Sequence, residues 1–379
     1  MKYHFNTIDK AENLLGKRIL VRVDFNVPIE NTRVVDDFRI RKALKTIKFL
    51  KDAGARLILI SHLDEQNGRT LEPVFEYLNK LFPVIFGKNI SDPKAKELIN
   101  SLKDGDVILF ENLRDNPGES ANDDRFAKLL SSLADIYVNE AFPVSHRKHT
   151  SIVGVPKYLP HFAGFLFAEE VTNLSNVFNP PKPSLFILGG AKFDTKLPLI
   201  TKFLRHADHV FVGGALSNNI FKEKGFNIGA SRISSGNFDI KKIIDNPRLI
   251  IPEDVITKNG EKIEHKKSSA LSDGDVIVDV GPKTISSLSH IVSSAKCVLW
   301  NGPLGQYEEG FTDQTKALAK LVAFSPNAKL AVVGGGDTLA SIESLGLFEK
   351  IGFVSTGGGA MLQFLLDETL PGIQALERS

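Results

Sequence analysis

Arginine, histidine and acidic side chains follow the expected strands in the first half of the chain. The groups are Arg22-Val-Asp24-Phe-Asn26, Ser61-His62, Glu111-Asn-Leu-Arg114, Asn139-Glu-Ala-Phe and His146-Arg147-Lys148-His149, with Arg39 opening the first expected helix. Because the carboxyl ends of parallel strands meet at one edge of a sheet, we expect these groups to share a rim. Guanidinium groups bind carboxylate or phosphate bidentately. The first half is therefore predicted to bind a small, strongly anionic ligand.

Glycines follow the expected strands in the second half. They are Gly189-Gly190, Gly213-Gly214, Gly281, Gly302, Gly334-Gly335-Gly336 and Gly357-Gly358-Gly359. Glycine lets the backbone approach a ligand and exposes N–H groups at the start of the next helix, which is an arrangement that binds phosphate. Lys192 and Lys196 follow the first of these turns, and Asp337 follows the triple glycine, where it is a candidate Mg²⁺ ligand. The second half is predicted to bind a nucleotide.

Each of these signals has a simpler explanation when it is taken alone. A glycine after a strand usually serves only a tight turn. The other simpler explanations are surface histidines (His146, His149), a solvated helix face (Lys192, Lys196), a helix N-cap (Asp337) and a loop charge pair (Glu308, Glu309). The specific signal is that six glycine turns fall together at strand ends.

Standard motifs exclude several other classes of site. The P-loop needs Gly-Lys-Ser/Thr, but Gly16-Lys17 and Gly87-Lys88 are followed by Arg and Asn. The dinucleotide pattern G-x-G-x-x-G fails at Gly334, because Leu339 occupies its last position. The sequence has no HExxH and no nucleophile-elbow serine.

Composition indicates the cellular compartment of the protein and the classes of partner that it is not expected to bind. The chain has 379 residues, 42% hydrophobic and 24% charged, which is typical of a globular protein of two domains. A net charge of +2 gives no bulk reason to bind nucleic acid or anionic lipid, so neither is an expected partner. The single cysteine, Cys297, fits a reducing compartment. With no signal-peptide pattern and no apolar run near the roughly 20 residues of a membrane helix, we expect a cytoplasmic protein.

Apolar runs of strand length alternate with segments of helical spacing. Ile40, Ala43, Leu44, Ile47 and Leu50 predict a helix over 39–53 that ends at Gly54. Further helices are predicted at 71–81, 123–133 and 162–177, and strands at 17–23, 56–61, 107–110, 136–138, 185–188, 210–212, 248–251, 276–280, 298–300, 330–333 and 353–355. Short apolar strands between helices indicate parallel sheets covered on both faces. The predicted fold class is α/β, with two Rossmann-like domains joined by a hinge, each a mainly parallel sheet flanked by helices.

A proline cluster, Asn179-Pro-Pro-Lys-Pro183, separates the two halves and is expected to stiffen a linker. The predicted boundaries are an anion-binding domain over 1–165, an interdomain helix and linker over 166–183, and a nucleotide-binding domain over 184–367. Phosphoryl transfer between the two ligands is the natural inference from this pairing of sites.

Nine strings, in order along the chain, carry a resemblance to a known family. They are RVDFNVP (22–28), DDFRI (36–40), ENLR (111–114), SHRKHTSIVG (145–154), LGGAK (188–192), DVGPKT (279–284), WNGPLG (300–305), GGGDT (334–338) and STGGGA (355–360). With LPGI (370–373), they make nearly the whole chain resemble phosphoglycerate kinase.

The resemblance implies reversible transfer of the acyl phosphate of 1,3-bisphosphoglycerate to MgADP, giving 3-phosphoglycerate and ATP in glycolysis and gluconeogenesis. It implies a phosphoglycerate site of Asp24, Asn26, Arg39, His62, Arg114 and Arg147, and a nucleotide site of Lys196, Glu308, Gly335, Gly336, Asp337 and Thr338, with Asp337 on Mg²⁺. Arg39, Lys192, Gly358 and Gly359 would surround the migrating phosphoryl group. The resemblance also implies a monomer that bends at its hinge, with a C-terminal tail, 368–379, packed on the first domain.

The loop after Ser61-His62-Leu63 departs from the family pattern. Gly-Arg-Pro is replaced by Asp64-Glu65-Gln66, so Glu65 stands where the family has a phosphate-binding arginine. Losing one charge-assisted hydrogen bond costs about 1.5–3 kcal/mol, or roughly 10–100-fold in affinity. Arg69 is a hypothetical replacement from another register. Pro143-Val144-Ser145 and Met361 are further departures, and we expect both to be tolerated.

Three functions are therefore weighed. The leading one is an active phosphoglycerate kinase, which the retained Lys192, Asp337 and Gly358-Gly359 favour. The altered loop at Glu65 motivates two others, a nucleotide-binding protein that has lost phosphoglycerate and a related kinase acting on a different small acid.

Overall fold

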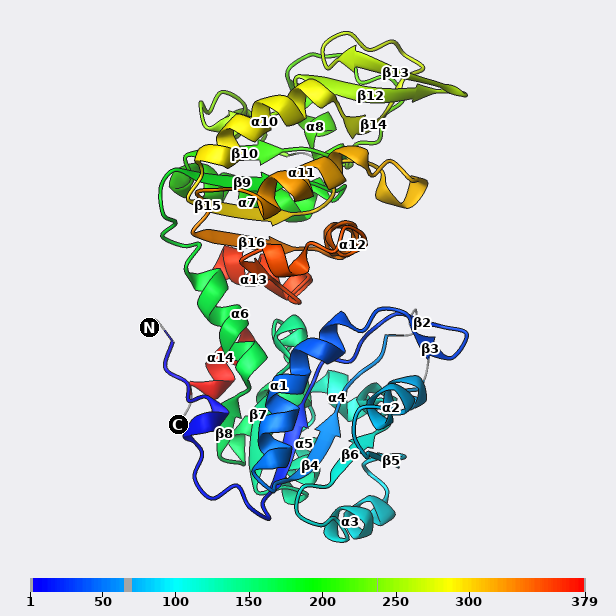
Figure 1. Ribbon diagram of the computed structural model, residues 1–379, viewed down its shortest axis with the longest axis vertical. Coiled ribbons are helices and arrows are strands. Elements are labelled where there is room, and N and C mark those ends of the chain that lie inside the picture. The colour runs from blue at the N-terminus through cyan, green and yellow to red at the C-terminus, as the bar shows by residue number, and fades with distance from the viewer. Residues whose placement is uncertain (1–2, 65–69, 237, 378–379) are drawn as a thin grey trace. The chain divides into compact units, whose positions relative to one another are not determined.

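The computed structural model describes residues 3–64, 70–236 and 238–377. The chain divides into two units (Figure 1), one built from 1–172 with 367–379 and the other from 173–366. The division falls within helix α6 (Phe165–Ser175). Within the first unit, the hydroxyl of Tyr3 donates to the carbonyl of Glu368 at 2.6 Å, so the two ends of the chain meet there.

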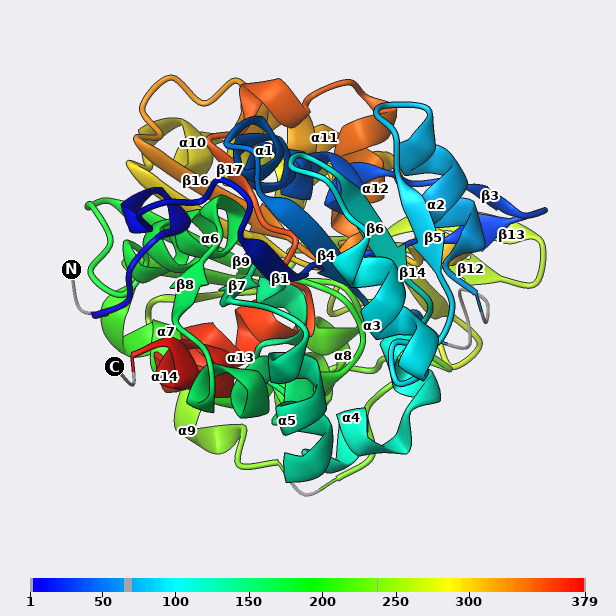
Figure 2. The same ribbon diagram turned by 90° about the horizontal axis from the view of Figure 1, so that it is seen from below.

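The first unit contains a six-stranded sheet in which every neighbouring pair is parallel. In sheet order the strands are β5 (Ile85–Gly87), β6 (Val107–Phe110), β4 (Arg56–Ile60), β1 (Arg18–Arg22), β7 (Ile136–Asn139) and β8 (His161–Ala163). Figure 2 shows them side by side in this order, with α1 (Phe38–Asp52) on one side and α4 (Pro117–Ala121) and α5 (Asp124–Ser132) on the other. Other elements of this unit include the hairpin β2 (Ile29–Glu30) and β3 (Arg33–Val34), and the helices α2 (Glu72–Asn79), α3 (Pro93–Asn100) and α14 (Pro371–Leu376).

Alternation along β1 explains why helices cover both faces of this sheet. Ile19 and Val21 join the core that α1 covers, and Leu20 between them is equally buried on the opposite face. From α1, Ile40 and Ile47 enter the same core. The predicted helix over 39–53 is therefore confirmed, and Gly54 follows it at φ +75°, a conformation that favours glycine.

The second unit contains another parallel sheet of six strands. Their order is β11 (Leu249–Ile250), β10 (His209–Val212), β9 (Ser184–Leu188), β15 (Cys297–Asn301), β16 (Leu330–Gly334) and β17 (Phe353–Val354). The helices are α7 (Phe193–His206), α8 (Ala215–Glu223), α9 (Lys241–Ile244), α10 (Pro282–Ser294), α11 (Asp313–Ala323), α12 (Gly336–Ser344) and α13 (Gly359–Asp367). When the six strands of this sheet are numbered in chain order, their spatial order is 3-2-1-4-5-6. Successive strands are therefore added toward one edge of the sheet up to β11 and toward the other edge from β15 onward, and the change falls between β9 and β15. The predicted α/β class, with parallel sheets flanked by helices, is confirmed.

The segment 276–280 was predicted to be a strand of the parallel sheet, but it does not join that sheet. It forms β14 (Val276–Val280), which pairs antiparallel with β12 (Asp254–Asn259), and β12 pairs antiparallel with β13 (Lys262–Lys267). The prediction missed this hairpin because β13 is largely polar and exposed, although the turn signal Asn259-Gly260 stands between its strands. Gly281 therefore follows a strand of the small sheet, and five of the six glycine turns belong to the parallel one.

One other predicted helix differs from the structure, and one short strand was missed. The segment 162–177 is not one helix, because β8 occupies its start and α6 begins only at Phe165. Gly164 separates them, and a Cβ there would lie 1.8 Å from Oε2 of Glu140, so a larger residue would force the Glu140 side chain to move. The short edge strand β5 was not predicted, since three residues carry too little periodicity to reveal it.

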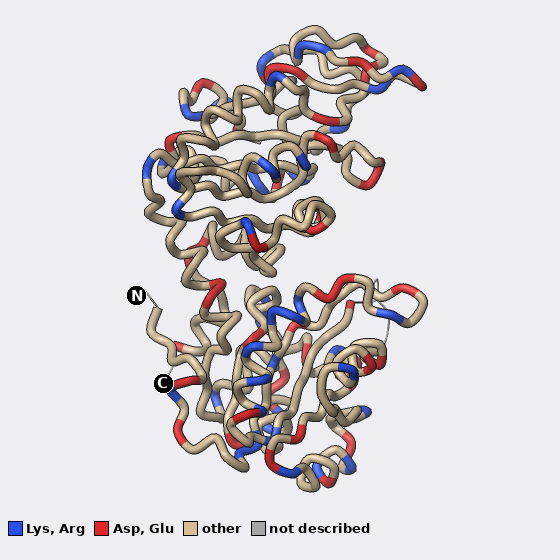
Figure 3. The backbone as a smooth tube through the Cα atoms, viewed as in Figure 1, with Lys and Arg blue, Asp and Glu red and all other residues tan. Residues whose placement is uncertain are grey.

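Charge and hydropathy of the described residues agree with the composition. Acidic and basic residues are interspersed along both units (Figure 3). Among the described residues, no helix combines the length and the apolar character needed to cross a membrane.

Candidate active site

Charged side chains at the ends of β1 and β4 form one network in the first unit. Arg39, in the first turn of α1, donates from Nη1 to Oδ2 of Asp24 at 3.0 Å. The Oδ1 atom of Asp24 lies 3.7 Å from Nδ1 of His62, and the Asp24 side chain is only 4% exposed. Nη2 of Arg22 lies 3.3 Å from the same histidine nitrogen. The structure thus brings three predicted residues, Asp24, Arg39 and His62, together around a buried arginine that ends β1.

A second group adjoins His62 through the loop that follows β4. Arg114 lies in the turn η3 (Leu113–Asp115) after β6, and its Nη1 pairs with Oδ1 of Asp64. Nδ2 of Asn26 donates to Oδ2 of Asp64 at 2.7 Å, and the same carboxylate oxygen is 4.0 Å from Nε2 of His62. Two further predicted residues, Asn26 and Arg114, therefore meet at Asp64.

His62 is buried among several arginine charges. Burial holds the pKa of His62 well below its usual value, and the charges of Arg22, Arg114, Arg39 and Arg147 lower it further. Burial and Arg114 likewise lower the pKa of His149 to about 4. The arginine charges that add to the effect of burial favour an anionic ligand near these two imidazoles.

Arg22 and Glu119 are buried charged residues outside the six residues that the resemblance assigns to phosphoglycerate. Nε of Arg22 donates to Oγ of Ser151 at 2.8 Å, and this hydroxyl donates to Oε1 of Glu119 at 2.6 Å. Burial raises the pKa of Glu119, and Arg22 opposes the rise. The signal available in the sequence was an arginine directly after the apolar residues Ile19, Leu20 and Val21, because a charge that is buried with such a strand needs a partner.

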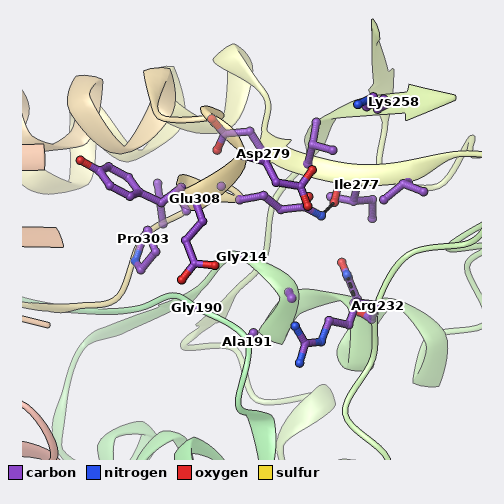
Figure 4. A pocket seen from close by; sticks show the side chains of 18 of the residues that line it. Gly190, Ala191, Gly214, Arg232, Lys258, Ile277, Asp279, Pro303 and Glu308 are labelled. Atoms are coloured by element: carbon purple, nitrogen blue, oxygen red, sulfur yellow. Dashed lines mark hydrogen bonds between the residues drawn. The ribbon is translucent and has the colours of Figure 1, made fainter. Parts of the chain in front are cut away.

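In the second unit, a cavity of about 710 Å³ opens beside the ends of β9, β10 and β15 (Figure 4). Its wall includes Gly190, Gly214, Pro303 and Glu308, and also Asp337 from α12. Glu308, in the turn η7 (Tyr307–Glu309), and Arg232 point into the cavity from opposite walls (Figure 4). This position is the topological switch point, where open parallel sheets bind their ligands.

Glycine is required where the loops after β9, β10 and β15 meet. Gly190 donates its N–H to the carbonyl of Pro303 at 2.9 Å. A Cβ on Gly189 would lie 2.2 Å from that carbonyl oxygen, and one on Gly302 would lie 2.4 Å from the carbonyl oxygen of Gly189. Gly302 and Gly214 also have positive φ, +98° and +61°. Backbone packs on backbone, which explains the clustering of glycines that the sequence analysis singled out.

Lys196 is a buried cation beside this cavity. It is 8% exposed, and its Nζ donates to the carbonyl of Gly189 at 2.6 Å. Burial lowers its pKa to about 8, while the charge of Asp337 acts in the opposite direction. The pKa of Asp337 is raised by burial and by Glu308. The charges of Lys196 and Glu308 therefore both act on Asp337, in opposite directions.

The remaining predicted residues occupy helix starts or exposed positions. Gly335 is the N-cap of α12, Gly336, Asp337 and Thr338 form its first turn, and Lys192, which is exposed, is the N-cap of α7. Asp337 is thus inside the helix rather than its N-cap. Gly358 directly precedes α13, which begins at Gly359, and Arg147 is exposed in the loop after η4 (Phe142–Val144). Arg39 lies in the first unit, whereas Lys192, Gly358 and Gly359 lie in the second.

Asn218 is a further cavity residue that sequence reasoning missed. It is 1% exposed, and its Nδ2 donates to the carbonyl of Arg232 at 2.8 Å. Its Oδ1 has no hydrogen-bond partner among the residues that the structure describes. No sequence signal distinguished this asparagine from its neighbour Asn219, because both lie within the same helix α8.

Comparisons with known proteins bear on the whole chain. The phosphoglycerate kinase family model matches residues 8–368. The chain belongs to the phosphoglycerate kinase family. It is 40% identical to the phosphoglycerate kinases of Dictyoglomus turgidum, over 97% of each chain, and of Chloroflexus aggregans, over 96% of each. Two solved phosphoglycerate kinases share its fold. That of Coxiella burnetii is 34% identical with a TM-score of 0.84, covering 98% of this chain and 99% of its own. That of Pyrococcus horikoshii is 30% identical with a TM-score of 0.87, covering 98% of each.

One residue of the loop that departs from the phosphoglycerate kinase pattern, Asp64, lies among the predicted residues of the first unit. Glu65 and Arg69, on which the sequence analysis focused, lie outside the described residues. Asp64 is described, and its carboxylate contacts Arg114 and Asn26. The substitution thus adds an acidic group at the predicted phosphoglycerate residues.

Proposed function

We propose that the protein transfers the acyl phosphate of 1,3-bisphosphoglycerate to MgADP, reversibly forming 3-phosphoglycerate and ATP. Membership of the phosphoglycerate kinase family over residues 8–368 carries the proposal. The convergence of Arg22, Arg39, Arg114 and Arg147 on His62 supports an anionic substrate in the first unit. The glycine-lined cavity supports a nucleotide in the second.

In the first unit, Asp24 and Asn26 are assigned to the glycerate hydroxyl and carboxylate. Arg39, His62, Arg114 and Arg147 are assigned to the phosphate and the reacting carboxyl group. Asp24 holds Arg39 through the 3.0 Å contact, so the guanidinium is oriented before substrate arrives. A fixed cation costs no reorganisation during phosphoryl transfer, which depends mainly on positioning and charge.

In the second unit, Glu308 is assigned to the ribose and Lys196 to the nucleotide phosphates. Gly335, Gly336 and Thr338 are assigned to the phosphates through the start of α12, where backbone N–H groups are unpaired within the helix. Asp337 is the carboxylate that would hold Mg²⁺. One carboxylate suits this ion, which takes its other ligands from phosphates and water and neutralises phosphate charge when bound.

Lys192 and the backbone of Gly358 and Gly359 are assigned, with Arg39, to the migrating phosphoryl group. Because Arg39 belongs to the other unit, the reaction requires the two units to approach each other around the substrates and exclude water. We assign this hinge motion to the working cycle. Each chain carries both sets of residues, which supports a monomer, and the buried free thiol of Cys297 fits a reducing cytoplasm.

The test is turnover of 3-phosphoglycerate and MgATP by the purified full chain, coupled to reduction of the bisphosphoglycerate formed. We expect turnover well above that of K192A. No turnover above K192A would refute the proposed function. A nucleotide-binding protein without kinase activity is the second candidate, because Asp64 already contacts two predicted phosphoglycerate residues. Calorimetry separates the two, since ADP binding without 3-phosphoglycerate binding would favour the second.

A further inference from the structure

The Asp64 carboxylate occupies groups that an anionic ligand of the first unit would use. It pairs with Nη1 of Arg114 and accepts from Nδ2 of Asn26 at 2.7 Å. The backbone N–H of Asp64 donates in return to Oδ1 of Asn26 at 3.0 Å, so both polar atoms of that amide face residue 64. The two contacts of the carboxylate, with Arg114 and with Nδ2 of Asn26, are of the kind that a bound carboxylate ligand would make, and here the chain itself supplies them.

Arg114 has capacity that Asp64 does not use. Its Nε and Nη2 are buried and have no hydrogen-bond partner among the residues that the structure describes. A guanidinium that binds an anion bidentately presents two donors side by side. Asp64 engages only Nη1, and an incoming anion that used a donor pair including Nη1 would have to displace the Asp64 carboxylate.

Exposure distinguishes Asp64 from the other carboxylate of the network. The side chain of Asp24 is 4% exposed, which fits a permanent partner of Arg39. The side chain of Asp64 is 40% exposed. A partly exposed ion pair contributes little to stability, so a half-exposed carboxylate can leave its partner for water at a small cost. The Asp64 carboxylate is therefore displaceable.

We propose that Asp64 is a built-in competitor that lowers the affinity of this site for its anionic substrate, a phosphorylated carboxylic acid. The inference rests on the proposed function for the identity of that substrate. The family pattern has glycine at this position, which provides no competing charge. Asp64 therefore sets the substrate concentration at which the site fills, by contacts with Arg114 and Asn26 rather than by any part in phosphoryl transfer.

The experiment compares the full chain with D64N, D64G and the matched control D104N. D64G removes the side chain altogether and keeps the test open if D64N folds poorly. Asp104 also pairs with an arginine, at 2.9 Å from Arg56, but Arg56 starts β4 at the opposite edge of the sheet. The readouts are KM for 3-phosphoglycerate, KM for MgATP, kcat, and the rise in unfolding temperature with added sulfate as a simple divalent anion.

We expect D64N and D64G to lower KM for 3-phosphoglycerate about tenfold, the effect of one charge-assisted hydrogen bond. KM for MgATP should not change, and D104N should behave as the parent. An unchanged or higher KM for 3-phosphoglycerate in both variants would overturn the inference and leave the proposed function standing. If neither the parent protein nor any variant turns over 3-phosphoglycerate, the proposed function fails, and sulfate binding then tests the inference about Asp64. Tighter sulfate binding by the Asp64 variants than by the parent would support the inference, and equal or weaker binding would overturn it.

Discussion

The buried ammonium of Lys196 predicts a pH-dependent affinity for MgADP. Its pKa is lowered to about 8 by burial, so about nine-tenths of the protein carries this charge at pH 7 and about one-tenth at pH 9. Only the charged form attracts phosphate. The dissociation constant of MgADP is therefore expected to rise about tenfold between pH 7 and pH 9, a loss of about 1.4 kcal/mol.

Calorimetric titration of the full chain with MgADP at pH 7, 8 and 9 measures this change. The nucleotide contributes little, because phosphate groups with a second pKa of about 6 are already ionised at pH 7. At pH 9 binding should also take up close to one proton, seen as a heat that varies with the ionisation enthalpy of the buffer.

Two substitutions on α7 isolate the cause. K196M should bind more weakly at pH 7 and lose the pH dependence. K202M should keep it, since the ammonium of Lys202 donates to the carbonyls of Leu365 and Leu366 at 2.9 and 2.8 Å rather than to the glycine loop at Gly189. The reasoning is refuted if the parent protein binds MgADP equally at pH 7 and 9, or if K196M retains the tenfold change.

Three further predictions concern binding and stability. R39Q removes the cation that Asp24 orients, so kcat/KM for 3-phosphoglycerate should fall at least about hundredfold while MgADP affinity, measured by calorimetry, is retained. G302A places a Cβ 2.4 Å from a backbone oxygen at a residue with positive φ, so it should lower the free energy of unfolding, measured in urea, by about 2 kcal/mol or more. The control G336A should not, because the space around a Cβ at Gly336 is open. Equal urea midpoints of the two variants would contradict this prediction. Burial raises the pKa of Glu140 to about 8, so folding binds a proton, and the free energy of unfolding should fall as pH rises from 4.5 to 8. In the same urea assay, E140Q should show a smaller fall between pH 6 and pH 8. An equal fall would exclude Glu140 as its cause.

The loop after His62 illustrates what a motif comparison can and cannot predict. The replaced Gly-Arg-Pro shows that the loop departs from the family pattern, and its most evident change is Glu65 in place of an arginine. The structure instead draws attention to Asp64, because its carboxylate reaches Asn26 and Arg114, which are 38 and 50 residues away in sequence. Contacts at such separations depend on the order of β1, β4 and β6 in the sheet, which no local pattern encodes.

Burial of Lys196 in the predicted nucleotide site is likewise a property that the sequence could not predict. Lys196 was correctly placed after a glycine turn, but a lysine on a helix is normally solvated. Lys196 is buried, and its pKa is lowered, because the loops that follow β9 and β15 pack around its ammonium, which donates to the carbonyl of Gly189. Asn218 was missed for the same reason, since its orphaned oxygen is defined by what surrounds it.

Residue types and spacing along the chain were enough to establish the α/β class, the helix over 39–53, the glycine turns and membership of the family. These features are local, because periodicity reports which side of a segment is apolar and glycine reports a special backbone conformation. Tertiary packing alone decided that 276–280 leaves the parallel sheet, that Asp64 lies on Arg114, and that Lys196 is buried. Strand order, desolvation and charge proximity arise from segments distant in sequence, and the free energies that they control exist only once those segments meet.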